Sequence, residues 1–121
     1  MNTTELIDRY CAAWSGSDAK ARAAQLSDVW AAGATYTDPR AHTTGADELL
    51  AHIAKVHAAR PNSRVLRTTA VDFHHGVARF GWRAVDVAGN TLLEGIDLAF
   101  ISTDSTRIER IVGFFGALQP L

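Results

Sequence analysis

The sequence changes character between residues 59 and 63. Residues 3–59 are rich in Ala and Leu at helical spacing, whereas residues 63–116 carry Val, Ile, Phe and Thr in runs of strand length separated by turn signals. The turns are short enough to join antiparallel neighbours as hairpins. This order predicts helices first, followed by an antiparallel meander of four strands.

Three helices are predicted in the first part of the chain. The first begins at Asn2, which forms a capping box with Glu5, and stops at the sequence SGSD. The second begins at Asp18 and ends at Gly33, and a short strand with the sequence ATYTD follows it. The third occupies the segment GADELLAHIAKVHAARP and is closed by Pro61.

The strand with the sequence TLLEGIDLAFIS is apolar on both sides. By alternation, one of its faces carries Leu93, Gly95, Asp97, Ala99 and Ile101, and the opposite face is also mostly apolar. A strand of this kind needs cover on both faces, but the helices can cover only one. We therefore predict a homodimer that forms through the outer face of the sheet.

The size and charge of the chain limit its partners. A length of 121 residues, 47% of them hydrophobic, fits one globular domain that spans residues 1–121. The 12 Lys and Arg against 13 Asp and Glu include no basic cluster, so nucleic acid is not expected as a partner. Solvated edges or dimer salt bridges account for the dispersed arginines Arg60, Arg64, Arg67, Arg79, Arg83, Arg107 and Arg110.

Nothing in the sequence indicates a membrane or an export signal. There is no apolar run near the roughly 18 residues of a membrane span, and the start MNTTE lacks the features of a signal peptide. The single cysteine, Cys11, cannot form an internal disulfide. We expect a soluble, cytoplasmic protein.

Three polar residues stand out, and each has an ordinary structural explanation. Asp97 lies in mid-strand among apolar residues, where an ionised carboxylate would have to be paired, solvated or protonated. Asp38 precedes Pro39, a step that commonly ends a strand and starts a turn. Tyr10 lies on the apolar face of the first helix, as many core tyrosines do.

Together these residues resemble a known family. The stretches DRYCAAW, GATYTDP, TTGADELLAHI and EGIDLAF, in this order, resemble the NTF2-like superfamily, in its SnoaL-like and ketosteroid isomerase-like branch. The resemblance covers nearly the whole chain. It implies an α+β cone in which three N-terminal helices pack on a strongly bent antiparallel sheet and enclose an apolar pocket. It also implies that Tyr10, Asp38 and Asp97 are the catalytic residues.

The resemblance implies a role for each of the three. Asp38 would be the ionised base that removes a proton beside a carbonyl, while Tyr10 and a protonated Asp97 would donate hydrogen bonds to the resulting oxyanion. Opposite protonation states for the two carboxyl groups are those of ketosteroid isomerase itself and come with the resemblance. The surroundings agree, because Asp97 has apolar neighbours and Asp38 adjoins the polar loop PRAHTTG.

The expected ligand is a small, flat or polycyclic hydrophobic molecule that carries a carbonyl. Strand alternation and the resemblance together assign the pocket lining to Trp30, Ile53, Val56, Phe80, Trp82, Ala84, Ile111, Gly113 and Phe115. The sequence departs from the isomerases at the positions of their supporting tyrosines, which here correspond to Trp30 and Ile53. Neither residue can relay a phenolic hydrogen bond.

The sequence is also compatible with other functions of this fold. The same cone also serves SnoaL-like polyketide cyclases, and some members form a non-catalytic module for ligand binding or dimerisation. An epoxide-hydrolase-like site is disfavoured, because Arg83 and Asp86 are three apart and point to opposite faces of a strand.

The five histidines do not form a metal-binding pattern. His52 and His57 are five apart and do not share a helix face, and His74 and His75 occupy a turn. We therefore expect neither a metal nor a cofactor. His42, in the loop after Asp38, is either a solvated loop residue or a helper in proton transfer at the mouth of the pocket.

Overall fold

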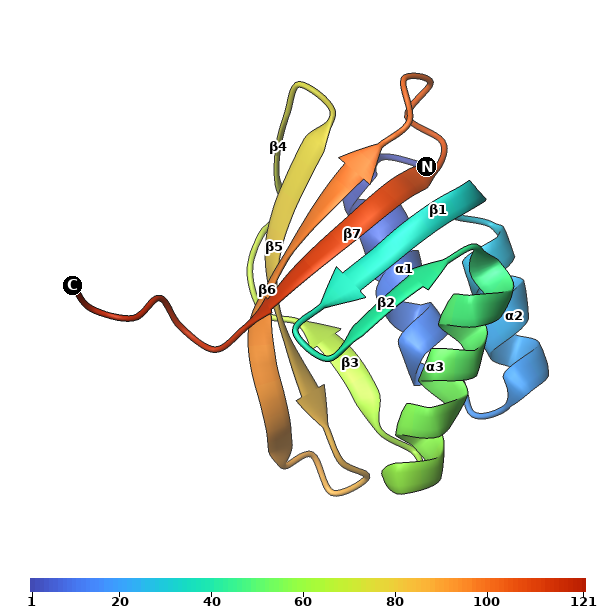
Figure 1. The fold of residues 1–121 in the computed structure, drawn as a ribbon, viewed down its shortest axis with the longest axis vertical. Helices are drawn as coiled ribbons and strands as arrows, with labels where there is room; N and C mark the ends of the chain where they lie inside the picture. Colours follow the sequence, from blue (N-terminus) through green and yellow to red (C-terminus); the bar gives the residue numbers. More distant parts are fainter.

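Three helices lie against one face of a single curled sheet in the computed structural model, which describes all 121 residues (Figure 1). The helices are α1 (Thr3–Ser15), α2 (Ala19–Ser27) and α3 (Ala46–Ala59). The strands are β1 (Trp30–Asp38), β2 (Ala41–Thr44), β3 (Arg64–Arg67), β4 (Asp72–His74), β5 (Val77–Val85), β6 (Thr91–Ile101) and β7 (Ile108–Phe115). The expected α+β class is confirmed. The residues after β7 extend away from the sheet (Figure 1).

The sheet has the strand order β2-β1-β7-β6-β5-β3, and β4 pairs with β5. The expected meander is confirmed from β5 to β7, and β3 and β4 are two short strands that pair with different stretches of β5. One pair differs from the expectation, since β1 runs parallel to β7. These two strands come from opposite halves of the chain, so no hairpin turn sets their relative direction.

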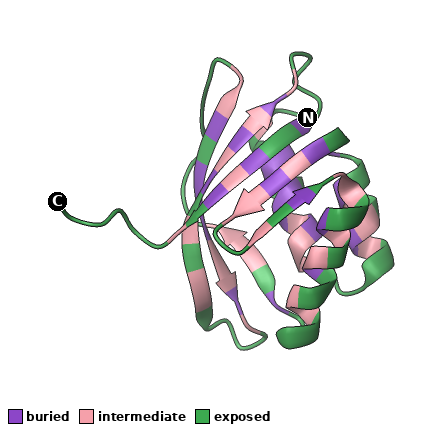
Figure 2. Ribbon diagram, in the orientation of Figure 1, coloured by how far each residue is buried: buried purple, intermediate pink, exposed green.

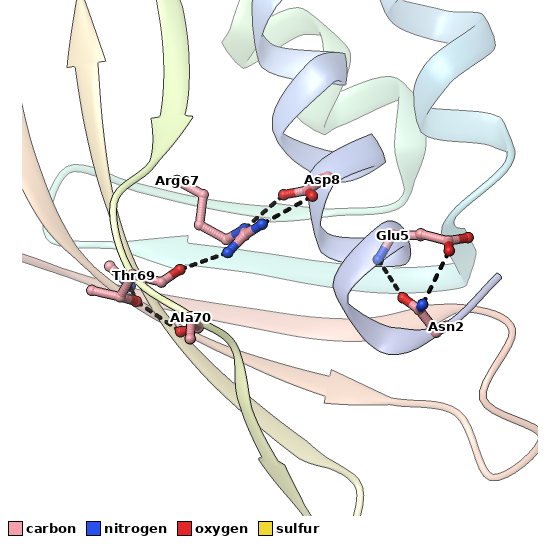
Figure 3. A network of polar contacts seen from close by, with 7 residues as sticks. Asn2, Glu5, Asp8, Arg67, Thr69 and Ala70 are labelled. Carbon is pink, nitrogen blue, oxygen red and sulfur yellow. Dashed lines mark hydrogen bonds and ion pairs between the residues drawn. The ribbon is translucent and has the colours of Figure 1, made fainter.

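Side-chain caps begin the first two helices where the sequence predicts them. The backbone N–H of Glu5 donates to Asn2 Oδ1 over 2.8 Å, and the Asn2 amide donates to the Glu5 carboxylate over 3.0 Å (Figure 3). Asp18 caps α2 in the same way, over 2.7 Å. None of the three helices has the length and apolar character that crossing a membrane requires.

The second helix is shorter than predicted. It ends at Ser27, and Trp30, which the prediction placed in this helix, is the first residue of β1. The cause is pairing with a distant strand, because Trp30 lies opposite Ile108 of β7. Gly33, the predicted helix end, lies within β1 at φ 72°, where the register with β7 shifts. Tertiary pairing thus overrides the helical pattern.

The core lies between the helices and the inner face of the sheet. In β6 the predicted alternation is confirmed, with Asp97, Ala99 and Ile101 buried while Glu94 and Ile96 are exposed. Figure 2 shows bands of buried and exposed residues along the strands. The buried stripes of the strands therefore face the helices. An aspartate on such a stripe is surrounded by the core on most sides.

An ion pair holds α1 against β3. Arg67 of β3 donates two hydrogen bonds to the carboxylate of Asp8 on α1, over 2.7 and 3.1 Å, and a third to the backbone carbonyl of Thr69 over 2.7 Å (Figure 3). A bidentate pair of this kind sets orientation as well as distance. It fixes α1 on the sheet two residues before Tyr10.

Candidate functional site

A pocket of about 280 Å³ lies between the helices and the inner face of the sheet. This is close to the lower end of the range of about 300–1,000 Å³ that is common for small-molecule sites. Ten of its 17 lining residues are hydrophobic. The lining residues are Tyr10, Trp14, Tyr36, Asp38, Arg40, His52, Val56, Arg60, Ser63, Arg64, Val65, Trp82, Ala84, Leu92, Leu93, Asp97 and Phe115.

The structure brings Tyr10, Asp38 and Asp97 together in this pocket, from α1, the end of β1 and the middle of β6. Gly113 of β7 lies beside the two carboxyl groups and opposite Asp97 in the sheet register. A Cβ atom at Gly113 would lie 2.7 Å from Asp97 Oδ1 and 3.7 Å from Asp38 Cβ. The absence of a side chain at this position allows the two carboxyl groups to share one site.

Asp97 is 6% exposed and accepts a hydrogen bond of 2.8 Å from the indole Nε1 of Trp82 at its Oδ1 atom. The pKa of Asp97 is raised to about 7: burial raises it most, the hydrogen bond from Trp82 opposes the shift, and the charge of Asp38 adds to it. Near neutral pH a large fraction of Asp97 is therefore a neutral carboxylic acid, which can donate a hydrogen bond.

Asp38 is held at both of its carboxylate oxygens. The hydroxyl of Tyr36 donates to Oδ2 over 2.5 Å, and the backbone N–H of Arg40 donates to Oδ1 over 2.7 Å. The second bond closes the turn around Pro39, as expected for Asp before Pro. Asp38 thus forms the turn and also faces the pocket.

Tyr36 is a site residue that the sequence analysis missed. It precedes Asp38 by two positions on β1, so strand alternation places both side chains on the same face. Burial raises the pKa of the Tyr36 phenol, and the hydrogen bond to Asp38 and the charge of Asp38 raise it further. The phenol therefore stays protonated and remains a donor to Asp38.

Tyr10 is 2% exposed, and its hydroxyl has no hydrogen-bond partner in the protein. Its ring is stacked on Trp30, with ring centroids 5.7 Å apart and planes inclined by 12°. Burial raises the pKa of Tyr10 well above its ordinary value, and the charge of Asp97 adds to this shift. The side chain of Trp14 lies close enough to oppose the shift, but it does not reach hydrogen-bonding geometry with the Tyr10 hydroxyl. A buried hydroxyl without a partner is unusual, and in the wall of a pocket it is available to a ligand.

The residues predicted to line the pocket fall into two groups. Val56, Trp82, Ala84 and Phe115 line it, and Gly113 lies beside its carboxyl groups. The structure places the others in the core outside this pocket: Trp30, Ile53, Phe80 and Ile111. Alternation gives the correct face of each strand, but the helices fill the space over part of that face.

Three further lining residues form an aromatic wall. The ring of Trp14 lies 5.3 Å from that of Tyr36, and the His52 ring lies 5.8 Å from Trp14 and 6.0 Å from Tyr36. Helical spacing could have identified two of them, because Trp14 follows Tyr10 by four residues on α1 and His52 precedes Val56 by four on α3.

His42 does not line the pocket. It lies on β2, is exposed, and its Nδ1 atom is 2.7 Å from the hydroxyl of Thr37. Of the two roles considered for His42, the structure thus agrees with that of a solvated residue.

A scan against protein-family models and a search of curated proteins both find no match for this sequence. Solved structures do match. A proposed isomerase of the SnoaL-like family from Agrobacterium tumefaciens superposes with a TM-score of 0.86 at 27% identity, over 94% of this chain and 97% of that chain.

Two more distant structures share the fold. A protein from Catenulispora acidiphila with a ketosteroid isomerase-like fold, in complex with trimethylamine, has a TM-score of 0.72 at 18% identity, over 93% of this chain and 85% of its own. A proposed SnoaL-like polyketide cyclase from Jannaschia sp. CCS1 has a TM-score of 0.73 at 12% identity, over 93% and 84%. With the mixed, curled sheet and its three helices, these likenesses confirm the cone-shaped fold and the predicted resemblance to the NTF2-like superfamily, in its SnoaL-like and ketosteroid isomerase-like branch.

Proposed function

We propose that the protein is an acid/base enzyme that moves a proton next to a carbonyl group of a small hydrophobic substrate, through an enolate. The observation that carries this proposal is the convergence of Tyr10, Asp38 and Asp97 on one largely apolar pocket. The reaction needs a base for the proton and hydrogen-bond donors for the oxygen that becomes negative. Both kinds of group are present.

Asp38 acts as the base. Its carboxylate takes the proton from the carbon beside the carbonyl, the electrons of that C–H bond form the carbon–carbon double bond of the enolate, and the carbonyl π electrons move to oxygen. In a β,γ-unsaturated substrate, Asp38 then returns the proton to the γ-carbon: the electrons of the β,γ double bond form the new C–H bond, those of the enolate double bond form a double bond between the α- and β-carbons, and the carbonyl re-forms from the electrons on oxygen. The double bond has moved and no atom is gained or lost. The bonds from Tyr36 and from the Arg40 N–H hold the carboxylate in one orientation.

Tyr10 and Asp97 donate to the enolate oxygen. The Tyr10 hydroxyl has no competing partner in the protein. In Asp97, Oδ1 accepts from Trp82, which leaves Oδ2 to carry the proton and donate it. Both donors are almost fully buried, and hydrogen bonds to a developing charge are stronger in such surroundings than in water.

The surroundings of the donors differ from the isomerase pattern. Trp30 and Ile53 stand where the isomerases carry supporting tyrosines, and Trp30 stacks on the Tyr10 ring without bonding its hydroxyl. The phenol of Tyr36 instead serves the base. In this protein a tyrosine therefore supports the proposed proton acceptor, Asp38, and not the donors to the enolate oxygen.

A SnoaL-like cyclase is the alternative reaction. Its chemistry uses an acid/base aspartate on a polyketide carbanion in the same kind of cone, and one structural relative is a proposed SnoaL-like polyketide cyclase. Both reactions begin with a carbanion next to a carbonyl, so the roles of Asp38 and Asp97 carry over. A pocket that binds a hydrophobic ligand without turnover is the remaining alternative.

We further propose a cytoplasmic homodimer that forms through the outer face of the sheet. Cross-strand neighbours on β6 and β7 present apolar side chains there: Ile96 opposite Phe114, and Leu98 opposite Val112. Phe114 is 58% exposed and Ile96 is 38% exposed. An apolar patch on a sheet face is typical of an interface between subunits.

The test is isomerisation of β,γ-unsaturated ketones to conjugated enones, followed by ultraviolet absorbance. A one-ring cyclohexenone and a 3-ketosteroid would both be assayed, because the pocket volume of about 280 Å³ favours the smaller substrate. Asp38→Asn should abolish turnover, whereas Asp28→Asn, in a surface ion pair away from the pocket, should not. Turnover that survives Asp38→Asn would contradict the proposal, and binding without turnover would favour the cyclase or the non-catalytic pocket.

A further inference from the structure

The mouth of the pocket is cationic. Only three of the lining residues are exposed, and all three are arginines: Arg40, Arg60 and Arg64. Tyr10 and Asp97, by contrast, are almost fully buried. A ligand that reaches the donors at the buried end therefore has its other end among guanidinium groups.

Two of these arginines have no partner in the protein. The 12 basic residues comprise ten arginines and two lysines. The guanidinium groups of six arginines donate hydrogen bonds. Two more, Arg40 and Arg110, lie over the rings of Phe115 and Phe100. Only Arg60 and Arg64 make none of these contacts, and both line the pocket.

A residue with a hydroxyl group, Ser63, lies between Arg60 and Arg64 in the sequence. Ser63 is 5% exposed and lines the pocket, and its hydroxyl takes part in none of the side-chain hydrogen bonds of the protein. A backbone hydrogen bond of 3.2 Å from the Ser63 N–H to the Arg60 carbonyl closes the turn that contains Pro61 and Asn62. One short segment after α3 thus carries two guanidinium groups and a hydroxyl without protein partners, all of them donors.

The charges along the pocket favour an anion. Its only acidic lining residues are Asp38 and Asp97. Asp38 already accepts two hydrogen bonds, and burial keeps much of Asp97 neutral. No carboxylate lines the mouth to neutralise the arginines. A cleft lined by an excess of one sign of charge attracts ligands of the opposite sign, and a guanidinium group matches a carboxylate in shape.

We propose that the substrate carries a carboxylate at the end remote from its reacting carbonyl, and that Arg60, Arg64 and Ser63 bind this carboxylate. The inference rests on the proposed function, because it takes the enolate oxygen to lie between Tyr10 and Asp97. It narrows the substrate class from a hydrophobic ketone to a small hydrophobic keto acid.

Three two-ring phenols test the inference by fluorescence titration: 2-naphthol, 6-hydroxy-2-naphthoic acid and its methyl ester. In each, the phenol stands in for the enolate, and only the acid has a carboxylate at the opposite end. At low salt the acid should bind about tenfold more tightly than the ester. In Arg60→Gln/Arg64→Gln this advantage should disappear while 2-naphthol binds as before. Arg79→Gln/Arg107→Gln removes the same charge outside the pocket and should change nothing.

The outcomes separate the inference from the proposed function. Equal binding of the acid and the ester overturns the inference. Tighter binding of the acid than of the ester overturns it as well if it survives in Arg60→Gln/Arg64→Gln or disappears in the control variant Arg79→Gln/Arg107→Gln. In each of these cases 2-naphthol binding that weakens in Asp97→Ala, which removes the donor, still supports the oxyanion site. Tight, arginine-dependent binding of the acid, with no effect of Asp97→Ala on any phenol, supports the carboxylate site and contradicts the enolate chemistry. If none of the three binds, both are wrong.

Discussion

The indole N–H of Trp82 donates a hydrogen bond of 2.8 Å to Oδ1 of Asp97. An indole can only donate, so the atom it contacts must remain an acceptor. The proton of the neutral Asp97 acid is thereby assigned to Oδ2. Trp82 thus orients the acid, although its bond also favours the charged form and opposes the effect of burial.

Asp97 should make stability depend on pH. Its pKa is raised to about 7 in the folded protein. The unfolded value is ordinary, about 3.9, so between these two values the folded state binds more protons than the unfolded state. The free energy of unfolding should fall as pH rises through this window, by up to about 1.4 kcal/mol per pH unit, and level off above pH 7. Urea denaturation of the wild type and Asp97→Asn from pH 4 to 8 measures this, and parallel curves would refute it.

Tyr10→Phe should separate activity from stability. The Tyr10 hydroxyl is buried without a partner, so its removal should leave the free energy of unfolding unchanged or raise it by about 1 kcal/mol. Loss of one donor to an oxyanion should lower kcat by about 100-fold or more. Tyr36→Phe is the matched variant, and it should lower stability by about 1 kcal/mol because it breaks the bond to Asp38. A stability loss in Tyr10→Phe as large as in Tyr36→Phe would contradict this assignment.

Gly113→Ala should damage the carboxyl pair. The new methyl group would lie 2.7 Å from Asp97 Oδ1, an atom already held by Trp82. Overpacking of this kind costs about 1–3 kcal/mol of stability. The cost should be smaller in an Asp97→Ala background, where the obstructing oxygen is gone, and a double-mutant cycle measures the difference. Equal costs in the two backgrounds would mean that the backbone, and not Asp97, limits the space.

Phe114→Glu should dissociate the proposed dimer. The side chain is exposed on the outer face of the sheet, opposite Ile96. A charge placed in an apolar interface is costly, so sedimentation velocity should show a dimer for the wild type and a monomer for this variant. Phe73→Glu, at an exposed residue on β4, is the control and should remain dimeric. A wild type that sediments as a monomer would refute the dimer.

Much of the fold and the central residues of the site follow from the sequence. The caps at Asn2 and Asp18 mark the helix starts, and the alternation in β6 places Asp97 on the inner face. The end of α2 does not follow from the sequence, because Trp30 pairs with Ile108 of β7, a strand far along the chain. Local patterns contain no information about such a partner.

Alternation also does not distinguish the pocket from the core. Phe80 and Trp82 share one face of β5, yet Phe80 lies opposite Asp97 in the core, whereas Trp82 reaches the pocket. The difference is their depth relative to the helices, which depends on how three separate elements pack. Arg60 and Arg64 were missed for a related reason: each looks like an ordinary solvated arginine until the pocket beside it is known.

The parallel pairing of β1 with β7 has a consequence for the order of assembly. Asp38 ends β1, and Asp97 and Gly113 meet where β6 pairs with β7, so the final strand of the chain joins the two carboxyl groups. During synthesis Asp38, the proposed base, emerges early but has no neighbouring acid until the C-terminal strand inserts between β1 and β6. Contacts between such distant segments form late in folding. The proposed activity should therefore appear only with the last strand, and partly made chains carry the aspartates without the site.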